Sequence, residues 1–344
     1  MNIAFIGAGR WAMTLALVLH RKDNEIKMWE FSRERLEKFV KIKKMPDLPD
    51  SILIPENIII TDDLERTLES AEIIFFAVPS QTLRSVLTKM SPFRFNINQN
   101  KLYHNGPILV SAIKGLENNT NKRMSEMIKE FFPNLRIVIL AGPGIPYEIV
   151  QGKPASLVAA SHDMLVVDII QKLLSLENLR IYTHPDVVGV ELGGALKNII
   201  AIAAGICDGL KLGDNAKAAL ITRGLAEITR LGISMNANPM TFAGLSGIGD
   251  VIVTSYSPYS RNRLFGEQIA QGNSFEQTTK ALSGIAEGVA TTTSAKALAV
   301  KMRIEAPIIE EIYAILFQHT DIKRSTKRLM ERPLKKEMSY EVNY

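Results

Sequence analysis

An apolar segment near the middle of the chain holds a lysine whose neighbours are spaced for chemistry. In Glu191-Leu-Gly-Gly-Ala-Leu-Lys197-Asn198, two glycines lie three and four residues before Lys197, so in a helix all three share one face. A glycine inside a helix costs about 1 kcal/mol relative to alanine, so Gly193 and Gly194 indicate that a bulky group approaches this face. The spacing leaves open whether that group is a ligand or a tightly packed second helix. A lysine ammonium in such a place could stabilise a developing oxyanion and donate a proton.

Two further polar segments follow in the second half of the chain. Gly244-Leu-Ser-Gly247-Ile-Gly249-Asp250 is a glycine-rich turn that ends in a carboxylate, and on its own it fits a loop with an aspartate cap. Ser260-Arg261-Asn262-Arg263 begins a predicted helix, where free N–H groups and two guanidiniums would bind a phosphate. The alternative is a capped, solvated helix start. Basic residues there oppose the helix dipole, which favours an anionic ligand.

The N-terminus carries a dinucleotide-binding pattern, G-x-G-x-x-A. Gly7-Ala-Gly9-Arg10-Trp11-Ala12 follows a short apolar run and opens a predicted helix. In this motif Gly7 permits the tight turn, Gly9 lets the backbone approach a pyrophosphate, and the small Ala12 lets helix and strand pack closely. The pyrophosphate then lies at a helix N-terminus, where free N–H groups and the dipole favour anions. The alternative, a glycine-rich turn without a ligand, is disfavoured by the strand–turn–helix–strand context.

The second predicted strand ends in an acidic residue at the spacing that this motif requires. Glu30 lies 23 positions after Gly7 and is predicted to bind the hydroxyls of the adenosine ribose. This favours NAD over NADP, and Phe31 offers an apolar face to adenine. Two alternatives stay open: Arg33 could neutralise a 2′-phosphate, which makes NADP the second choice of cofactor, and Glu30 could be an ordinary exposed acid.

These motifs lie in a first half that alternates strands and helices. Strands are predicted at residues 2–6, 26–30, 58–60, 73–78, 108–112 and 136–141, with 155–160 and 179–182 extending the sheet, and helices at 11–21, 32–43, 81–90 and 122–132. Short apolar strands that alternate with helices predict a parallel sheet covered on both faces. The predicted fold class is an α/β Rossmann-type N-terminal domain with a parallel-sheet core, followed by an all-α C-terminal domain.

Strand patterns end near residue 186, and helices follow. They are predicted at residues 187–205, 216–232, 261–271, 289–301 and 307–317, with Gly232 and Gly272 at helix ends. We expect residues 1–186 to form the NAD(P)-binding Rossmann domain and residues 187–335 the helical domain for substrate binding and catalysis. Residues 336–344 are expected to be a disordered polar tail.

Composition excludes several classes of protein. The 344 residues include one cysteine, Cys207, so a disulfide framework is excluded and a buried side chain in a reducing compartment is expected. The net charge of +5 is local, because residues 323–336 carry seven basic residues and one acidic one. This run is predicted to be a solvated end and not a nucleic-acid site. Residues 187–206 have the length of a membrane span, but Glu191, Lys197 and Asn198 favour a buried helix in a cytoplasmic protein without a membrane span.

Taken together, these segments resemble the NAD(P)-dependent glycerol-3-phosphate dehydrogenases over nearly the whole chain, from about Asn2 to Glu331. The strongest similarity lies in GVELGGALKNIIAIAAGICDGL (189–210), NAKAALITRGLAEITRLG (215–232) and SRNRLFG (260–266). SAIKGLE (111–117), AGPG (141–144) and AEGVATT (286–292) match as well. The family reduces dihydroxyacetone phosphate to sn-glycerol 3-phosphate, reversibly, for phospholipid synthesis.

The resemblance implies roles for the residues at matching positions. Lys197 resembles the catalytic acid/base. Substrate contacts are implied for Lys114, Gly142, Asp250, Ser260, Arg261 and Asn262. Cofactor contacts are implied for Arg10, Trp11, Glu287 and part of the AGP loop, and Lys114 and Arg261 are also expected beside the cofactor. No metal is expected, since the five histidines form no ligand spacing.

Three positions depart from the family pattern. Bacterial members usually read GPSFA where this chain has Gly142-Pro-Gly144-Ile-Pro146, so the substrate contact expected at Gly144 lacks its serine hydroxyl. Phe31 replaces the arginine that many bacterial members carry two places beyond the tryptophan, and it resembles the NAD-using eukaryotic enzymes. Arg10 stands where serine is common.

Two other interpretations stay open at the level of sequence. A dehydrogenase of the same two-domain architecture could act on a hydroxy acid or ketopantoate, but it would not need Ser260, Arg261 and Asn262 as a phosphate clamp. A non-catalytic NAD(H)-sensing regulator would need a partner-binding or DNA-binding element, for which only the basic run is available, and it would not need both Lys114 and Lys197. The sequence is compatible with a homodimer and does not fix the oligomeric state.

Overall fold

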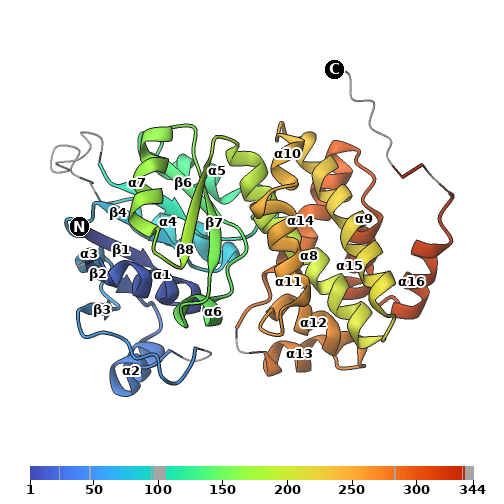
Figure 1. The fold of residues 1–344 in the computed structure, drawn as a ribbon, viewed down its shortest axis with the longest axis horizontal. Helices are drawn as coiled ribbons and strands as arrows, with labels where there is room; N and C mark the ends of the chain where they lie inside the picture. Colours follow the sequence, from blue (N-terminus) through green and yellow to red (C-terminus); the bar gives the residue numbers. More distant parts are fainter. Residues whose placement is uncertain are drawn as a thin grey trace.

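The fold was analysed in a computed structural model of the 344-residue chain. It describes residues 1–22, 24–45, 48–93, 95, 106–282, 284–334 and 336–337. The predicted tail at 336–344 therefore lies almost entirely outside the described residues. Two halves lie side by side, one built on a sheet and one built of helices, and α8 (Val187–Gly209) lies among the helices of the second half (Figure 1).

An eight-stranded sheet forms the core of the first half. Its strands are β1 (Asn2–Ile6), β2 (Glu25–Trp29), β3 (Ile58–Thr61), β4 (Ile73–Phe76), β5 (Ile108–Ser111), β6 (Ile137–Ala141), β7 (Ala155–Ala160) and β8 (Leu179–His184). The spatial order is β3-β2-β1-β4-β5-β6-β7-β8. The order reverses between β1 and β4, which is the switch point where open α/β sheets bind ligands.

The predicted parallel pairing is confirmed for the strands from β1 to β6, and each predicted strand is present within two residues of its bounds. The last two strands differ, because β7 runs antiparallel to β6 while β8 is parallel to β7. The sheet is therefore mixed at one edge.

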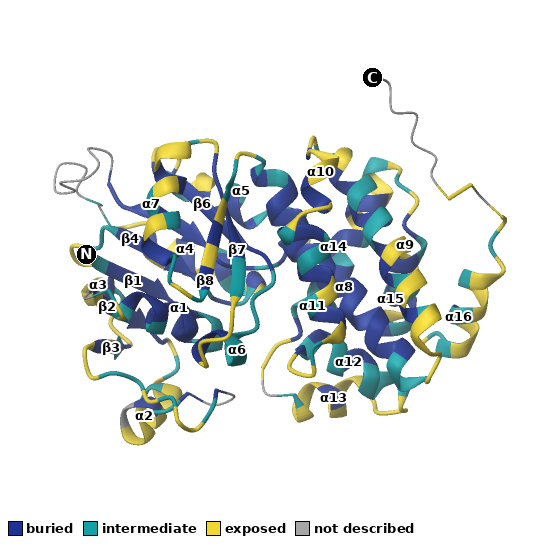
Figure 2. Cartoon of the chain, viewed as in Figure 1, coloured by how far each residue is buried: buried dark blue, intermediate teal, exposed yellow. Residues whose placement is uncertain are grey.

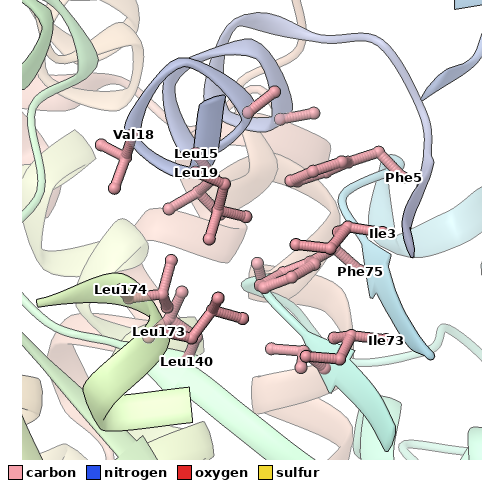
Figure 3. Packing of buried hydrophobic residues seen from close by; sticks show 14 of the residues in the cluster. Ile3, Phe5, Leu15, Val18, Leu19, Ile73, Phe75, Leu140, Leu173 and Leu174 are labelled. Atoms are coloured by element: carbon pink, nitrogen blue, oxygen red, sulfur yellow. The ribbon is translucent and has the colours of Figure 1, made fainter. Parts of the chain in front are cut away.

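Helices cover both faces of the sheet. In β1, Ile3 and Phe5 point to one face and Ala4 and Ile6 to the other, and each set joins a separate buried cluster. The first cluster includes side chains of α1 (Arg10–His20), α2 (Arg33–Ile42), α6 (Pro146–Val150) and α7 (Met164–Leu174). Figure 3 shows part of this packing, where the rings of Phe5 and Phe75 stack at 4.8 Å. The second cluster includes side chains of α3 (Leu64–Leu68), α4 (Leu83–Met90) and α5 (Met124–Phe131).

Helix α8 is the centre of the second half. The helices that pack against it are α9 (Asp214–Ile233), α10 (Pro239–Phe242), α11 (Asp250–Tyr256), α12 (Arg261–Ala270), α14 (Glu287–Met302) and α15 (Pro307–Phe317). Outside them, α13 (Phe275–Ala281) packs on α12 and α16 (Ile322–Met330) packs on α15. The most apolar 18-residue window of α8 has a mean hydropathy of 1.6, enough for a membrane span, yet 94% of that window is buried inside the protein (Figure 2). The apolar side chains of α8 are therefore part of the core, as the sequence predicts. The free Cys207, near the end of α8, is also buried.

Two sequence predictions about helix ends have different outcomes. Gly272 has φ +94 two residues after the end of α12, as expected of a helix-ending glycine. The prediction for Gly232 is wrong, because α9 continues to Ile233 and a Cβ at Gly232 would lie 2.2 Å from the ring of Phe242. That glycine is there for close packing.

Most of the basic run forms a helix that the sequence analysis did not predict. Residues 322–330 form α16, whose N-cap Asp321 accepts a hydrogen bond from the Arg324 amide. Ile322 and Leu329 pack against the helical core, while the lysines and arginines face outward. The charged side chains are solvated as expected, on the outer face of an amphipathic helix.

Candidate functional site

Two lysines from the two halves converge on one aspartate. Lys197 Nζ, on α8, lies 2.7 Å from Asp250 Oδ1, and Lys114 Nζ lies 2.6 Å from Asp250 Oδ2. Lys114 follows β5, and it also donates a hydrogen bond of 3.0 Å to the carbonyl of Gly142, directly after β6. Asp250 begins α11 and is 1% exposed. The cluster thus lies where the carboxyl ends of parallel strands meet the helical half.

Burial controls the electrostatics of this cluster. Desolvation lowers the pKa of Lys197 from 10.5 to about 7, the charge of Asp250 opposes that shift, and the charge of Lys114 adds to it. Lys197 also donates to the hydroxyl of Thr254, four residues after Asp250 on the same face of α11. An amine with this pKa can hold or release a proton near neutral pH. No group of three or more His, Cys, Asp or Glu side chains that could hold a metal occurs in the described parts of the chain.

The glycines before Lys197 make room for protein and not for a ligand. A Cβ at Gly193 would lie 2.5 Å from the carbonyl oxygen of Ser246, in the turn η2 (Leu245–Gly249). A Cβ at Gly194 would lie 3.3 Å from the Cβ of Ala141, at the end of β6. The alternatives left open by the sequence are thereby decided in favour of close packing, although by a turn and a strand end instead of a second helix. This approach brings Asp250 within reach of Lys197.

The three residues predicted to clamp a phosphate have different surroundings. Ser260 Oγ accepts a hydrogen bond from the Arg263 amide and so caps α12. Asn262 is buried; its Nδ2 donates to Asn198 Oδ1 and its Oδ1 accepts from the Gly288 amide, both at 2.9 Å. Asn262 therefore joins α8, α12 and α14.

Arg261 lies on the side of the site where α14 begins. The guanidinium fills the space beside Gly284, where a Cβ would lie 2.4 Å from Arg261 Nη1. Its charge also acts on Glu287, whose carboxylate accepts hydrogen bonds from the Ser80 amide at 3.2 Å and the Ser80 hydroxyl at 2.6 Å. Burial raises the pKa of Glu287 against the effect of these bonds. Since Ser80 follows β4, Glu287 is a second contact between the two halves.

The turn after β1 has the form of a dinucleotide cradle. Gly7 has φ +104, and a Cβ there would lie 2.9 Å from the carbonyl oxygen of Ala77. Nothing lies within 4 Å of the Cβ position of Gly9, so its backbone is open to a ligand, and Ala12 is fully buried against the sheet. Trp11 Nε1 is buried and has no hydrogen-bond partner among the residues that the structure describes. An open backbone and an unpaired donor fit a bound dinucleotide.

The glycine that replaces the usual serine has a steric explanation. A Cβ at Gly144 would lie 2.9 Å from Cη2 of Trp11 and 3.1 Å from Cδ2 of Leu157. The indole therefore takes the space in which a serine side chain would begin. The substrate contact predicted at Gly144 would therefore involve its backbone.

At the end of β2, the surroundings of Glu30 differ from one of the alternatives that the sequence left open. Glu30 is not an ordinary exposed acid: it is 1% exposed, and its Oε1 accepts a hydrogen bond of 3.0 Å from the Ser32 amide. The cation beside it is Arg35, 3.3 Å away, and not Arg33, which is 84% exposed and pairs with Glu37. Phe31 is 65% exposed and could meet a base.

Sequence reasoning missed Thr254, Asn198, Ser80 and Arg35. Thr254 and Asn198 have a signal that could have been used, because one lies a helical turn after Asp250 and the other directly follows Lys197. Ser80 has no such signal, since its partner Glu287 lies 207 positions away.

The fold and this site define a class of protein. A sheet that is parallel from β1 to β6, with a dinucleotide cradle at its switch point, is joined here to a helical half that supplies a buried lysine–aspartate pair. This is the architecture of a two-part nicotinamide-dependent dehydrogenase. The chain belongs to the NAD-dependent glycerol-3-phosphate dehydrogenase family: residues 2–167 match the N-terminus of the family and residues 186–327 match its C-terminus.

Relatives of known name agree with this assignment. A glycerol-3-phosphate dehydrogenase (NAD(P)+) of Thermoanaerobacter sp. is 42% identical over 98% of this chain and 99% of its own length. The crystal structure of glycerol-3-phosphate dehydrogenase from Coxiella burnetii aligns with a TM-score of 0.89 at 33% identity, over 96% of this chain and 98% of that one. A ketopantoate reductase from Ralstonia eutropha aligns with a TM-score of 0.59 at 13% identity over 96% of this chain and all of that one, a likeness that shows the fold alone.

Proposed function

We propose that this protein reduces dihydroxyacetone phosphate to sn-glycerol 3-phosphate, and catalyses the reverse reaction, with Lys197 as the proton donor and acceptor. The single observation that carries the proposal is the buried Lys197–Asp250–Lys114 cluster beside the dinucleotide cradle. The names of relatives about 40% identical along the whole chain support the choice of substrate.

The nicotinamide dinucleotide supplies the hydride when it is bound. As the ketone carbon is reduced, its oxygen gains negative charge, and the Lys197 ammonium stabilises that charge and then gives up a proton from Nζ. In the reverse direction neutral Lys197 takes the hydroxyl proton. Asp250 holds Lys197 and Lys114 with one carboxylate oxygen each, so both amines keep a fixed direction.

The substrate phosphate serves as a handle away from the reacting carbon. Arg261, at the first position of α12, is proposed to bind it together with amides at the start of that helix. Holding the phosphate fixes the position of the carbonyl relative to Lys197, which lowers the entropic part of the barrier. Asn262 acts here by holding α12 against α8 and α14.

NADH is the proposed preferred cofactor. Buried Glu30 would accept the ribose hydroxyls through its Oε2 atom and would disfavour a 2′-phosphate, while Phe31 offers an apolar face to adenine. A higher kcat/KM with NADPH than with NADH would sink this preference.

A homodimer and a cytoplasmic location belong to the same proposal. Light scattering of the purified protein tests the first, and cell fractionation tests the second. The single, buried Cys207 is consistent with a reducing compartment.

The deciding experiment follows the NADH absorbance band with dihydroxyacetone phosphate as substrate. Unphosphorylated dihydroxyacetone and ketopantoate serve as controls, because they test the phosphate handle and the rival dehydrogenase. We expect rapid oxidation of NADH with dihydroxyacetone phosphate alone. Faster turnover with ketopantoate, or none with any of the three, would refute the proposed function.

A further inference from the structure

We propose that Arg263 is a positioning residue: its ion pair with Asp208 fixes the first turn of α12 and thereby the place from which Arg261 reaches the substrate phosphate. The inference rests on the proposed function, because it concerns the proposed phosphate handle. It deepens that function by giving different tasks to two guanidiniums that lie close together in the sequence. In this arrangement Arg261 binds the phosphate, and Arg263 holds the helix that carries Arg261.

The two guanidiniums at the start of α12 have different surroundings. Because each residue turns an α-helix by about 100°, the side chains of Arg261 and Arg263 point to opposite sides of α12. Arg263 Nε lies 2.6 Å from Asp208 Oδ2, and its Nη1 lies 3.3 Å from Glu267 Oε2. These two carboxylates pair with the guanidinium of Arg263, whose side chain is 16% exposed. Arg263 is therefore not a second phosphate ligand beside Arg261.

Asp208 is itself held in place from another helix. It lies in the last turn of α8, and Lys217, on α9, places its Nζ 2.9 Å from Asp208 Oδ1 and 2.8 Å from Asp208 Oδ2. Lys217 is buried, and its Nζ lies 4.2 Å from the centroid of the Tyr256 ring. A carboxylate near the C-terminus of a helix opposes the helix dipole, so Lys217 and Arg263 stabilise Asp208 there. The carboxylate thus joins α12 to both α8 and α9.

The contact between α8 and α12 brings their backbones together across glycines. A Cβ at Gly205 would overlap the carbonyl oxygen of Arg263, and a Cβ at Gly266 would overlap the carbonyl oxygen of Ile202. Ridges of side chains that fit into grooves normally fix how two helices cross. Glycines remove such ridges at this contact. Polar anchors therefore contribute to the position of α12 on α8.

Two such anchors are adjacent on α12 and well separated on α8. Asn262 donates to Asn198 at 2.9 Å, and Arg263 donates to Asp208 at 2.6 Å. Asn198 and Asp208 lie about 15 Å apart along α8, from the rise of 1.5 Å per residue of a helix. Anchors at this spacing fix the direction of the first turn of α12 as well as its position. Because Arg261 directly precedes Asn262, loss of the Asp208 anchor displaces the phosphate handle.

The test compares a phosphorylated substrate with an unphosphorylated one. Arg263→Met keeps much of the side-chain volume, removes the charge and leaves Asp208 paired with Lys217. Its kcat/KM with dihydroxyacetone phosphate should fall about 10- to 100-fold, since a displacement of about 1 Å in a positioning group can cost that much. With unphosphorylated dihydroxyacetone, kcat/KM should stay nearly unchanged. A merely structural role of Arg263 would lower both values together.

Two further variants serve as controls. Arg328→Met removes an ion pair of the same length, 2.6 Å to Glu311, that joins α16 to α15, and it should change neither value. Arg263→Lys keeps the charge but loses the planar fork of the guanidinium, so its loss with dihydroxyacetone phosphate should be smaller than that of Arg263→Met. It also supplies the comparison if Arg263→Met does not fold.

A double variant separates positioning from direct contact with the phosphate. If Arg263 acts through Arg261, then Arg261→Ala combined with Arg263→Met should be no worse with dihydroxyacetone phosphate than Arg261→Ala alone. Additive losses would show that Arg263 binds the phosphate itself and would overturn the inference. Equal losses of Arg263→Met with both substrates, or no loss with either, would overturn it too.

These outcomes are distinct from failure of the proposed function. If the wild type reduces dihydroxyacetone phosphate but does not depend on Arg263, only the inference fails. If the wild type does not reduce dihydroxyacetone phosphate, the proposed function fails, and the anchor is tested by calorimetric titration with inorganic phosphate. Phosphate binding should then weaken in Arg261→Ala and in Arg263→Met and stay unchanged in Arg328→Met. Phosphate binding that is independent of Arg263, or absent from the wild type, overturns the inference as well.

Discussion

At the residue scale, the direct test is removal of the amine on α8. Lys197→Met keeps much of the side-chain volume and leaves Asp250 paired with Lys114. Loss of a proton donor that also stabilises an oxyanion should lower kcat by at least about 10²- to 10⁴-fold. Fluorescence titration should give nearly unchanged NADH binding. A variant that retained more than about a tenth of the wild-type kcat would have lost less than general-acid catalysis contributes. Lys197 would then be a packing residue, and Lys114 would be the next candidate for the proton donor.

The lowered pKa of Lys197 predicts opposite pH profiles for the two directions. Reduction needs the ammonium, so its kcat/KM should fall as the pH rises through about 7, whereas oxidation needs the neutral amine and should rise over the same range. Asp250 raises the pKa of Lys197, so Asp250→Asn should move both profiles toward lower pH. Profiles with the same slope in both directions would contradict the assignment.

The phosphate handle gives a third prediction at this scale. Arg261→Ala should cost about 2–5 kcal/mol of transition-state stabilisation with dihydroxyacetone phosphate, the range for breaking a buried charge contact. With unphosphorylated dihydroxyacetone the loss should be much smaller. Steady-state kcat/KM for both substrates measures the difference, and equal losses would make Arg261 structural.

The sequence predicted which residues belong to the site better than it predicted which residues they contact. Lys114, Lys197 and Asp250 were expected together through the family resemblance, and the structure brings them into contact. Their neighbours depend on packing between segments far apart in the chain. Gly193 faces a turn more than fifty positions later, and the choice between Arg33 and Arg35 depends on where α2 begins. Neither can be read from local spacing.

At the scale of elements, an aromatic contact links two segments that border the site. Tyr147, on α6, and Tyr259, just before α12, stack at 4.4 Å between ring centroids with an interplanar angle of 18°. The first follows the loop that carries Gly142, and the second precedes Ser260. The stack therefore fixes the two sides of the site relative to each other.

A double-mutant cycle tests that coupling. Tyr147→Ala and Tyr259→Ala should each raise KM for dihydroxyacetone phosphate about 2- to 10-fold, which corresponds to the ~0.5–1.5 kcal/mol typical of aromatic pairs. The double variant should be no worse than the worse single one, since either change removes the same contact. Tyr147→Phe keeps the ring and should behave as wild type. Additive losses would show that the rings act separately.

Elements with strong periodicity were predicted well, and two of the features that were not predicted show why. Helix α7 was missed because Val166, Val167 and Ile169 form a β-branched run that is typical of strands. The antiparallel direction of β7 was missed because side-chain alternation is the same in either direction. Both depend on tertiary context.

At the scale of the whole molecule, α8 is shared between two cores. Its first residues Val187 and Val190 pack with the sheet, while Leu192 and Ala195 pack with the helices. Between them lies Glu191, which accepts hydrogen bonds from the Ser125 amide at 2.8 Å, the Ser125 hydroxyl at 2.6 Å and Arg123 at 2.9 Å. One helix thus transmits the position of the sheet to Lys197 two turns later. The domain boundary at residue 186 stays a prediction. It lies directly before α8, whose side chains pack with both cores.

A second buried carboxylate makes the stability of the helical half depend on pH. Glu227, on α9, is 2% exposed and accepts hydrogen bonds from the Ile308 amide at 2.9 Å and the Ile309 amide at 3.3 Å, at the start of α15. Burial raises the pKa of Glu227 from 4.5 to about 7, although these bonds act in the opposite sense. The raised pKa means that the folded state binds the Glu227 proton more tightly than the unfolded state does. The resulting stabilisation of the folded state is complete below about pH 4.5 and is lost as the pH rises through about 7.

Glu227→Gln should therefore flatten the stability profile. A pKa shift of this size corresponds to roughly 3 kcal/mol of stability. Between pH 5 and pH 8, the free energy of unfolding in urea should therefore fall by about 3 kcal/mol more in the wild type than in the variant. Glu276→Gln, at an exposed carboxylate paired with Lys280, is the control and should follow the wild type. Parallel profiles for wild type and Glu227→Gln would mean that the α15 amides compensate the buried charge fully, and that Glu227 is ionised in the folded protein throughout this range.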